Sequence, residues 1–592
     1  MGSNMTNIFL DSNISNAKIT DDGNFLIYLK KYLRTKNLWV RNIKNHIEMN
    51  ITTQQMNDID IFDIKDNKFI FYLLKNKIVN SFSLFMYNIF NNSNILISND
   101  VISFDALENI SDDCISYVKN ERFLKIRKQY IFNIKTMNST EKFEFKDKEF
   151  LFVNKDIKNQ KCIYNKNLFP KYTFELAEKN YFINSINSKG KRLKILTIPS
   201  IQNFEIVGML SKSKLLVKTY SLEKYILGKY DLKLNLQEII YESNHDFSIN
   251  KIWVENNELL KFETYDACLN LILTNYCDSK LKDFETKINQ IFKSKIGDKV
   301  NSHIRIETSN DKKYCLIFET NTISKSNYYI YDIVASSLEK LSQTNVKLMN
   351  NNYIIPTNIS YNGLNFIIYN PFNILHKNAQ NVTHKVLIKF NDWPFCQRLN
   401  KYDLKNQIFA NNDYIVVNIY LDYDIKRWLN NNLEKTHFFN TYIENIVWNI
   451  INYLQKKFYY TSLSFTFLFE GLTGYIISNV ILNLEFEKNI IFDDALIGKK
   501  PHENWTYSSF DFGLKPINYL IQRDGLIKNK NNIIMTFDYS EDMNSFDDYY
   551  IVYKNIFKNI QNHYKKFKSI ILTNKNKTST ICKKINKIIT KI

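Results

Sequence analysis

The sequence predicts a multidomain α+β protein with a mixed N-terminal region, a β-rich middle domain and a C-terminal α/β domain whose sheet is mostly parallel. Its 592 residues are enough for several domains. With 44% hydrophobic and 23% charged residues, the composition is that of a globular chain. Only 12 Gly and 7 Pro occur, which excludes collagen-like and flexible linker proteins. The spacing of apolar residues also changes along the chain, and that change divides it into three parts.

The first part, residues 1–165, is expected to be mixed. Apolar residues recur at helical spacing over 25–41 and over 69–90, and this spacing predicts a helix in each range. A polar turn at 20–23 precedes the first of them.

The second part, residues 166–385, is expected to be a β-rich domain. Short apolar runs alternate there with polar turns, as in a meander or a sandwich. Examples are the runs 214–220, 252–254 and 314–319. Two helices are expected to interrupt the strands, near 279–296 and 330–343. We find no repeat of fixed period.

The third part, residues 386–592, shows strands alternating with helices, which is typical of βαβ units and a mostly parallel sheet. The strands are predicted at 386–390, 414–421, 463–469, 490–492, 532–537 and 569–573. The helices are predicted at 436–458, 473–486 and 546–567. Five of the twelve Gly fall between Gly471 and Gly525, a local concentration typical of site loops and of tight turns.

Carboxylates follow four of these strands. They are Asp422 and Asp424, Glu470, Asp493 with Asp494, and Asp538. In open α/β sheets the carboxyl ends of the strands form the ligand crevice. Gathered carboxylates repel one another unless a cation lies among them, and oxygen ligands suit Mg²⁺ or Mn²⁺. The alternative is that these acids cap helices and form turns.

The functional hypothesis is a metal-dependent phosphoryl-transfer enzyme, a nuclease or nucleotidyltransferase, acting on nucleic acid or nucleotide. Asp422, Asp424, Asp493 and Asp538 are the candidate ligands of Mg²⁺ or Mn²⁺. Glu470 and His502 are the candidate catalytic residues. The candidate phosphate-binding residues are Arg523, Lys565, Lys566, Lys568, Lys583 and Lys584.

The partner expected for such an enzyme is nucleic acid or another polyanion. The net charge is +19, and residues 549–592 contain eleven Lys and no acid. Against this, only nine of the 79 basic residues are Arg, and abundant Lys, Asn and Ile are typical of an AT-rich coding sequence. The first alternative function is therefore a non-catalytic scaffold or polyanion-binding protein. The second is a glycosyltransferase in which Asp422 and Asp424 hold a metal-bound diphosphate.

Missing motifs disfavour P-loop NTPases, common dinucleotide enzymes, serine hydrolases and zincins. The sequence contains no Walker A motif, GxGxxG, GxSxG or HExxH. Seven Cys without a CxxC pair predict reduced thiols and an intracellular, cytoplasmic protein. No apolar run is long enough for a membrane span. Gly2 fits a loose myristoylation pattern, and also the remnant of an expression tag.

Overall fold

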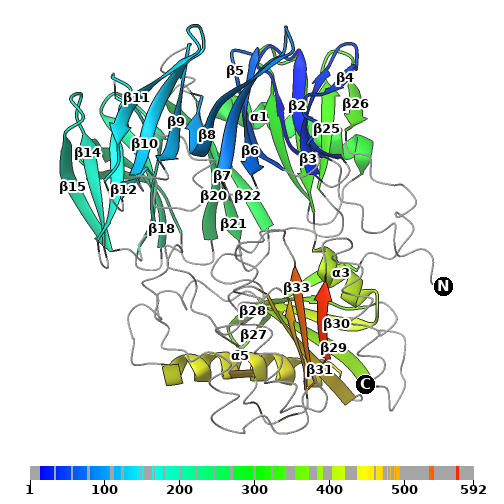
Figure 1. Cartoon of the computed structure of the whole chain (residues 1–592). Coiled ribbons are helices and arrows are strands. Elements are labelled where there is room, and N and C mark those ends of the chain that lie inside the picture. Colours follow the sequence, from blue (N-terminus) through cyan, green and yellow to red (C-terminus); the bar gives the residue numbers. More distant parts are fainter. Residues whose placement is uncertain are drawn as a thin grey trace.

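The computed structural model describes most residues from Ile14 to Leu341, with short gaps, and from Ile354 onward mainly the strands and helices named below. Beyond Asp493 it describes only residues 532–538 and 568–572. The described strands form six antiparallel sheets before residue 341 and one eight-stranded sheet after residue 355. Figure 1 shows the six sheets, coloured blue to green, on one side of the molecule and the eight-stranded sheet on the other.

Each of the six sheets is a meander that pairs strands adjacent in sequence. The first holds β1 (Ile14–Ile19), β2 (Phe25–Tyr32), β3 (Thr35–Asn42) and β4 (Glu48–Asn50). The second holds β5 (Ile59–Lys65), β6 (Phe69–Asn76), β7 (Ser81–Asn88), β8 (Ser93–Asp105), β9 (Cys114–Glu121), β10 (Ile126–Asn133) and β11 (Asn138–Glu144). The third holds β12 (Glu149–Phe150), β13 (Tyr172–Ala177), β14 (Asn180–Ile186) and β15 (Arg192–Pro199).

The other three sheets continue the same pattern. The fourth holds β16 (Asn203–Met209), β17 (Lys214–Ser221), β18 (Lys224–Asp231) and β19 (Leu236–Ser243). The fifth holds β20 (Phe247–Glu255), β21 (Glu258–Asp266) and β22 (Leu271–Tyr276). The sixth holds β23 (His303–Thr308), β24 (Tyr314–Thr320), β25 (Asn327–Asp332) and β26 (Ser337–Lys340).

The seven-stranded second sheet consists of two units that share β8. The first part of this 13-residue strand, up to Val101, pairs with β7, and the part from Val101 to Asp105 pairs with β9. The described strands before residue 341 therefore make seven blades of a β-propeller. We number them 1 to 7 along the chain, so that β1–β4 form blade 1, β20–β22 blade 6 and β23–β26 blade 7.

Apolar side chains packed between neighbouring blades hold the propeller together. Ile27 and Val40 of blade 1 share one cluster with Ile59 and Ile70 of blade 2. Such side chains are fully buried, and each stabilises the fold by about 1.5–3 kcal/mol. Because a blade meets a neighbour on each face, its strands are apolar on both faces.

Blade 7 packs against blade 1 and so closes the ring. Leu26 of blade 1 lies in one cluster with Leu316 and Ile330 of blade 7. At the same junction the Arg41 guanidinium donates hydrogen bonds of 2.8 Å to both carboxylate oxygens of Glu339. The first and last blades are thus joined by side-chain packing and an ion pair.

In blades 6, 7, 1 and 2 the first strand lies nearest the propeller axis, because the first strands of these blades meet one another. Strand β1 contacts β23, and Lys251 on β20 lies 4.0 Å from Glu307 on β23. An ion pair of 2.6 Å from Lys18 on β1 to Asp63 on β5 joins blades 1 and 2 in the same way. The last strands diverge instead, and most residues of β11 and β19 are exposed. Solvent-exposed side chains on the first strands therefore line the central channel.

Helix α1 (Ser279–Ile296) follows the three strands of blade 6 and packs against blade 7. The Asp278 side chain caps its N-terminus by accepting a 3.0 Å hydrogen bond from the Leu281 backbone N–H. Its buried residues Ile288 and Phe292 lie against Tyr329 and neighbouring apolar side chains of blade 7. The predicted helix at 279–296 is confirmed.

The eight-stranded sheet has the order β27-β28-β30-β29-β31-β32-β33-β34. Its strands are β27 (Pro356–Tyr361), β28 (Leu364–Tyr369), β29 (Thr383–Phe390), β30 (Tyr414–Ile419), β31 (Ser462–Glu470), β32 (Lys488–Asp493), β33 (Asn532–Asp538) and β34 (Lys568–Leu572). Strand β28 runs antiparallel to both of its neighbours, and the six strands from β29 to β34 are parallel to one another. Every residue of β30 is buried, as expected for a strand covered on both faces.

Two of the described helices, α3 and α5, accompany this sheet. Helix α3 (Leu404–Ala410) contacts β28 and β30, and its Gln407 side chain hydrogen-bonds the backbone of Ile354 in both directions. Helix α5 (Thr436–Lys457) buries Ile443, Val447 and Ile450 at helical spacing. No described helix is both long and apolar enough to cross a membrane.

The β-rich, multidomain character of the chain is confirmed, but several predicted helices are wrong. The range 25–41 forms β2 and β3, and the range 69–90 contains β6 and β7. The range 330–343 contains the end of β25 and all of β26. In the first two ranges, apolar side chains buried on both faces of a strand mimic the spacing of one helical face. The outer strands of the seven blades are irregular in length and sequence, so the sequence shows no repeat of fixed period.

Candidate functional site

Three of the acids predicted to form a site end neighbouring strands of the C-terminal sheet. Glu470 is the last residue of β31 and Asp493 the last of β32, and the two are register partners. Asp538 ends the next strand, β33, two residues beyond Thr536, which is the partner of Asp493. The backbone therefore brings Glu470, Asp493 and Asp538 to one edge of the sheet.

The other predicted site residues do not join this group in the described structure. Lys568 begins β34 and pairs with Ile534, whereas Asp538 pairs with Leu572. Four residues of extended strand, about 13 Å, therefore separate the level of Lys568 from that of Asp538. The remaining predicted residues lie outside the described residues: Asp422, Asp424, His502, Arg523, Lys565, Lys566, Lys583 and Lys584.

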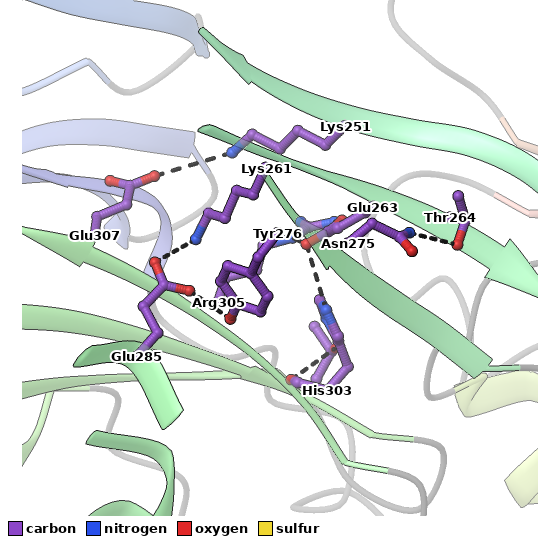
Figure 2. A network of polar contacts seen from close by, with 11 residues as sticks. Lys251, Lys261, Glu263, Thr264, Asn275, Tyr276, Glu285, His303, Arg305 and Glu307 are labelled. Atoms are coloured by element: carbon purple, nitrogen blue, oxygen red, sulfur yellow. Dashed lines mark hydrogen bonds and ion pairs between the residues drawn. The ribbon is translucent and has the colours of Figure 1, made fainter. Parts of the chain in front are cut away.

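A second candidate site, not predicted from the sequence, is a buried polar network where blade 6 meets blade 7 and α1 (Figure 2). Lys261 of β21 forms an ion pair of 2.5 Å with Glu285 of α1, and both side chains are about 95% buried, with exposures of 5% and 6%. The Tyr276 hydroxyl donates a 2.8 Å hydrogen bond to the other Glu285 oxygen. This carboxylate is therefore paired on both oxygens, as a buried charge requires.

The centre of the network is a second buried carboxylate, Glu263 of β21. The Arg305 guanidinium donates to both of its oxygens, at 2.7 and 2.5 Å, in the bidentate geometry that favours Arg over Lys. His303 Nε2 lies 3.3 Å from Glu263 Oε1, but without hydrogen-bond geometry, and neither ring nitrogen has a hydrogen-bond partner among the described residues. Burial lowers the pKa of His303 to about 4, although Glu263 acts in the opposite direction. His303 is therefore neutral near pH 7.

Lys251 and Glu307 lie at the end of the network away from His303 (Figure 2), on first strands of blades 6 and 7. Lys251 of β20 lies 4.0 Å from Glu307 of β23, and the two side chains are 45% and 44% exposed. Burial, together with Arg305 and Lys18, lowers the pKa of Lys251, and Glu307 and Glu263 oppose that effect. Lys251 thus stands on the channel wall among other cations.

Sequence reasoning missed this network because its members are spread over β20, β21, β22, α1 and β23. One weak signal exists. His303, Arg305 and Glu307 alternate with apolar residues along a short strand, which indicates one polar face. Nothing in the sequence indicates that this face meets Glu263, forty residues earlier.

Solved structures of several peptidases share this architecture. Dipeptidyl peptidase 4 of Porphyromonas gingivalis matches with a TM-score of 0.60 and 9% identity, covering 98% of this chain and 90% of that one. An acylaminoacyl peptidase of Pyrococcus horikoshii gives 0.59 and 11%, covering 98% and 95%. A puromycin-hydrolyzing peptidase of Mycobacterium tuberculosis gives 0.63 and 8%, covering 98% and 93%. No family model and no curated protein matches the sequence.

These findings correct the functional prediction. The similar structures are peptidases, so the metal-dependent phosphoryl-transfer hypothesis and its nucleic-acid substrate are wrong. The predicted Mg²⁺ or Mn²⁺ is contradicted as well, since the described residues contain no group of three potential metal ligands and peptidases of this architecture need no metal cofactor. The physical reason is that Asp and Glu are common where a strand leads into a turn or helix, whether or not a metal binds there. The chain has the fold of a β-propeller joined to an α/β-hydrolase sheet.

Proposed function

We propose that this chain recognises peptides through the architecture it shares with these peptidases, and that it does not cleave them with a serine nucleophile. The fold shared over 98% of the chain supports the recognition of peptides. The sequence that follows β31 is the main support for the absence of a serine nucleophile.

In α/β-hydrolases the nucleophile is the Ser of a G-x-S-x-G motif on a sharp turn from strand to helix, where glycines let the backbone turn tightly. No two of the twelve glycines in this chain lie four residues apart. The nearest approach is Gly471 and Gly474, directly after β31 and before the helical residue Ile477. Between them lie only Leu472 and Thr473, so the sequence offers neither Ser nor Cys between these two glycines.

A second feature of hydrolases is also missing from the sequence. Part of their oxyanion hole is a backbone N–H from the loop after the third strand, which in lipases and esterases carries an HGGG-type motif. In this chain β29 is the third strand of the sheet in chain order, and it is followed by Asn391, Asp392, Trp393 and Pro394. Two independent elements of acyl-transfer chemistry therefore depart from the hydrolase pattern, which favours binding without serine catalysis.

The test has two arms on the full chain. A biotinylated fluorophosphonate, which reacts with activated serines, should leave the protein unlabelled while it labels a serine peptidase of the same fold. Short dansylated peptides should bind with saturable fluorescence anisotropy. Labelling of this chain would overturn the non-catalytic part, and loss of that label in Thr473→Ala would assign the nucleophile to Thr473. Absence of peptide binding would overturn the recognition part.

Two further features are proposals. We place the division between the propeller and the C-terminal domain between Lys340 and Pro356, later than residue 165 and earlier than residue 385, the two divisions predicted from the sequence. A polyanion partner also stays a prediction, because most of the lysine-rich region 549–592 lies outside the described residues.

A further inference from the structure

The first strands of four successive blades carry a belt of alternating charges. In ring order these are Lys251 of blade 6, Glu307 of blade 7, Lys18 of blade 1 and Asp63 of blade 2. All four lie on strands next to the propeller axis, and Lys251 and Glu307 are nearly half exposed. The belt therefore faces the channel, where a bound peptide would meet it.

The cations near the belt differ in how well they are neutralised. Lys18 lies 2.6 Å from Asp63. Arg305 holds Glu263 with two hydrogen bonds. The contacts described for Lys251 are looser, namely Glu307 at 4.0 Å and the ring of Trp253 at 4.7 Å. Lys251 is thus the cation with the weakest counter-ion in this group, and an anion placed beside it would gain the most.

The backbone at Lys251 supports a role in binding. The register between β20 and β21 shifts between Ile249 and Ile252, so Lys251 lies in a β-bulge. Bulges redirect side chains and are frequent next to functional sites. The Trp253 ring lies under both Lys251 and Lys261, at 4.7 and 4.8 Å, and so restrains the direction of the Lys251 side chain.

We propose that Lys251 binds a carboxylate of the peptide in the channel, either the C-terminal carboxylate or an acidic side chain. This inference rests on the proposed recognition of peptides and specifies its substrate class, namely peptides with a free carboxylate. Glu307 has a second role, because it disfavours ligands that bring an additional carboxylate to its side of the belt.

The experiment uses three dansylated tetrapeptides with the full chain at low salt: dansyl-Ala-Ala-Phe-Ala with a free carboxylate, the same peptide as an amide, and the amide of dansyl-Ala-Ala-Phe-Glu. Wild type should bind at least one carboxylate peptide about tenfold more tightly than the neutral amide, the usual gain from a hydrogen bond to a charged group. Tighter binding of the peptide with the free C-terminus indicates that Lys251 binds the terminal carboxylate. Tighter binding of the Glu amide indicates that it binds an acidic side chain. The preference should weaken as salt rises.

Substitutions assign the preference to the lysine. Lys251→Gln should abolish it and Lys251→Arg should retain it. The matched control is Lys194→Gln, which removes the same charge from another lysine stacked on an aromatic ring, that of Phe182 in blade 4. Equal binding of all three peptides by wild type, or an unchanged preference in Lys251→Gln, overturns this inference alone. If none of the peptides binds, the proposed function fails together with it.

Discussion

His303 makes the stability of the propeller depend on pH in a way that one substitution can remove. Its ring is 92% buried between blades 6 and 7, and burial lowers its pKa from 6.5 to about 4. The unfolded chain therefore binds a proton near pH 6.5, and the folded chain does so only near pH 4. Between these values the unfolded state holds more protons, so stability is complete above pH 6.5 and falls as the pH is lowered.

The size of the effect follows from the two pKa values. Each pH unit between them is worth about 1.4 kcal/mol, so the loss is about 2 kcal/mol at pH 5 and about 3 kcal/mol near pH 4. Other groups contribute to acid lability too, including carboxylates such as Asp403. Burial raises the pKa of Asp403, but the ion pair with Lys389 and the hydrogen bond from the Asn406 backbone N–H lower it below its usual value. Only the difference between wild type and a His303 variant isolates the histidine.

The assay is urea unfolding followed by tryptophan fluorescence at pH 7 and pH 5. His303→Gln should lose about 2 kcal/mol less than wild type between these two pH values, whatever its stability at pH 7. The control is His46→Gln, because His46 is 65% exposed on blade 1. Because His46 also contacts Arg41 and Glu339, its substitution shifts stability at pH 7, but the loss of stability from pH 7 to pH 5 should equal that of wild type. If His303→Gln and wild type lose stability in parallel, the reasoning about the buried neutral ring is refuted.

Two other predictions concern packing and charge. Lys261→Met should destabilise the protein by about 3–5 kcal/mol because Glu285 is left buried without its cation, and Lys261→Met with Glu285→Leu should recover most of that loss in the same urea assay. An unrecovered double variant would contradict this. Gly228→Ala should lower stability by about 1–3 kcal/mol, since an added Cβ would meet the Leu236 side chain at 2.7 Å and the Glu238 carbonyl oxygen at 3.0 Å. Gly208→Ala, whose Cβ would meet only Val254 at 3.9 Å, is the tolerated control, measured by thermal unfolding.

The local spacing of residues was sufficient to predict a helix or strand where the signals for that element lie within it or directly beside it. The predicted helix at 279–296 has an Asp cap before it, a glycine after it and a helical apolar stripe, and the structure contains it as α1. The strand predicted at 414–421 is short, apolar and rich in β-branched residues, and its first six residues form β30. The absence of G-x-S-x-G is also a property of the sequence alone, and it distinguishes this chain from serine hydrolases that carry the motif.

Local pattern failed where burial depends on a neighbour distant in sequence. The run Phe69–Asn76 is apolar on both faces because blades pack against each side of it, and a run without alternation matches helical spacing as well as strand spacing. The packing of the neighbouring blades decides that this run forms a strand and not a helix. The seven-bladed arrangement can therefore be recognised only from the tertiary structure.

The sequence itself thus determined three features that depend on residues close together in the chain. They are the helical stripe of α1, the apolar strands of the C-terminal sheet and the absence of the nucleophile motif. Only the tertiary structure decided that β1 meets β23, that Glu263 pairs with Arg305 and that Lys251 faces the channel. These contacts join residues separated by tens to hundreds of positions. Their free energy comes from packing and charge pairing that exist only after the ring has closed, so no local spacing records them.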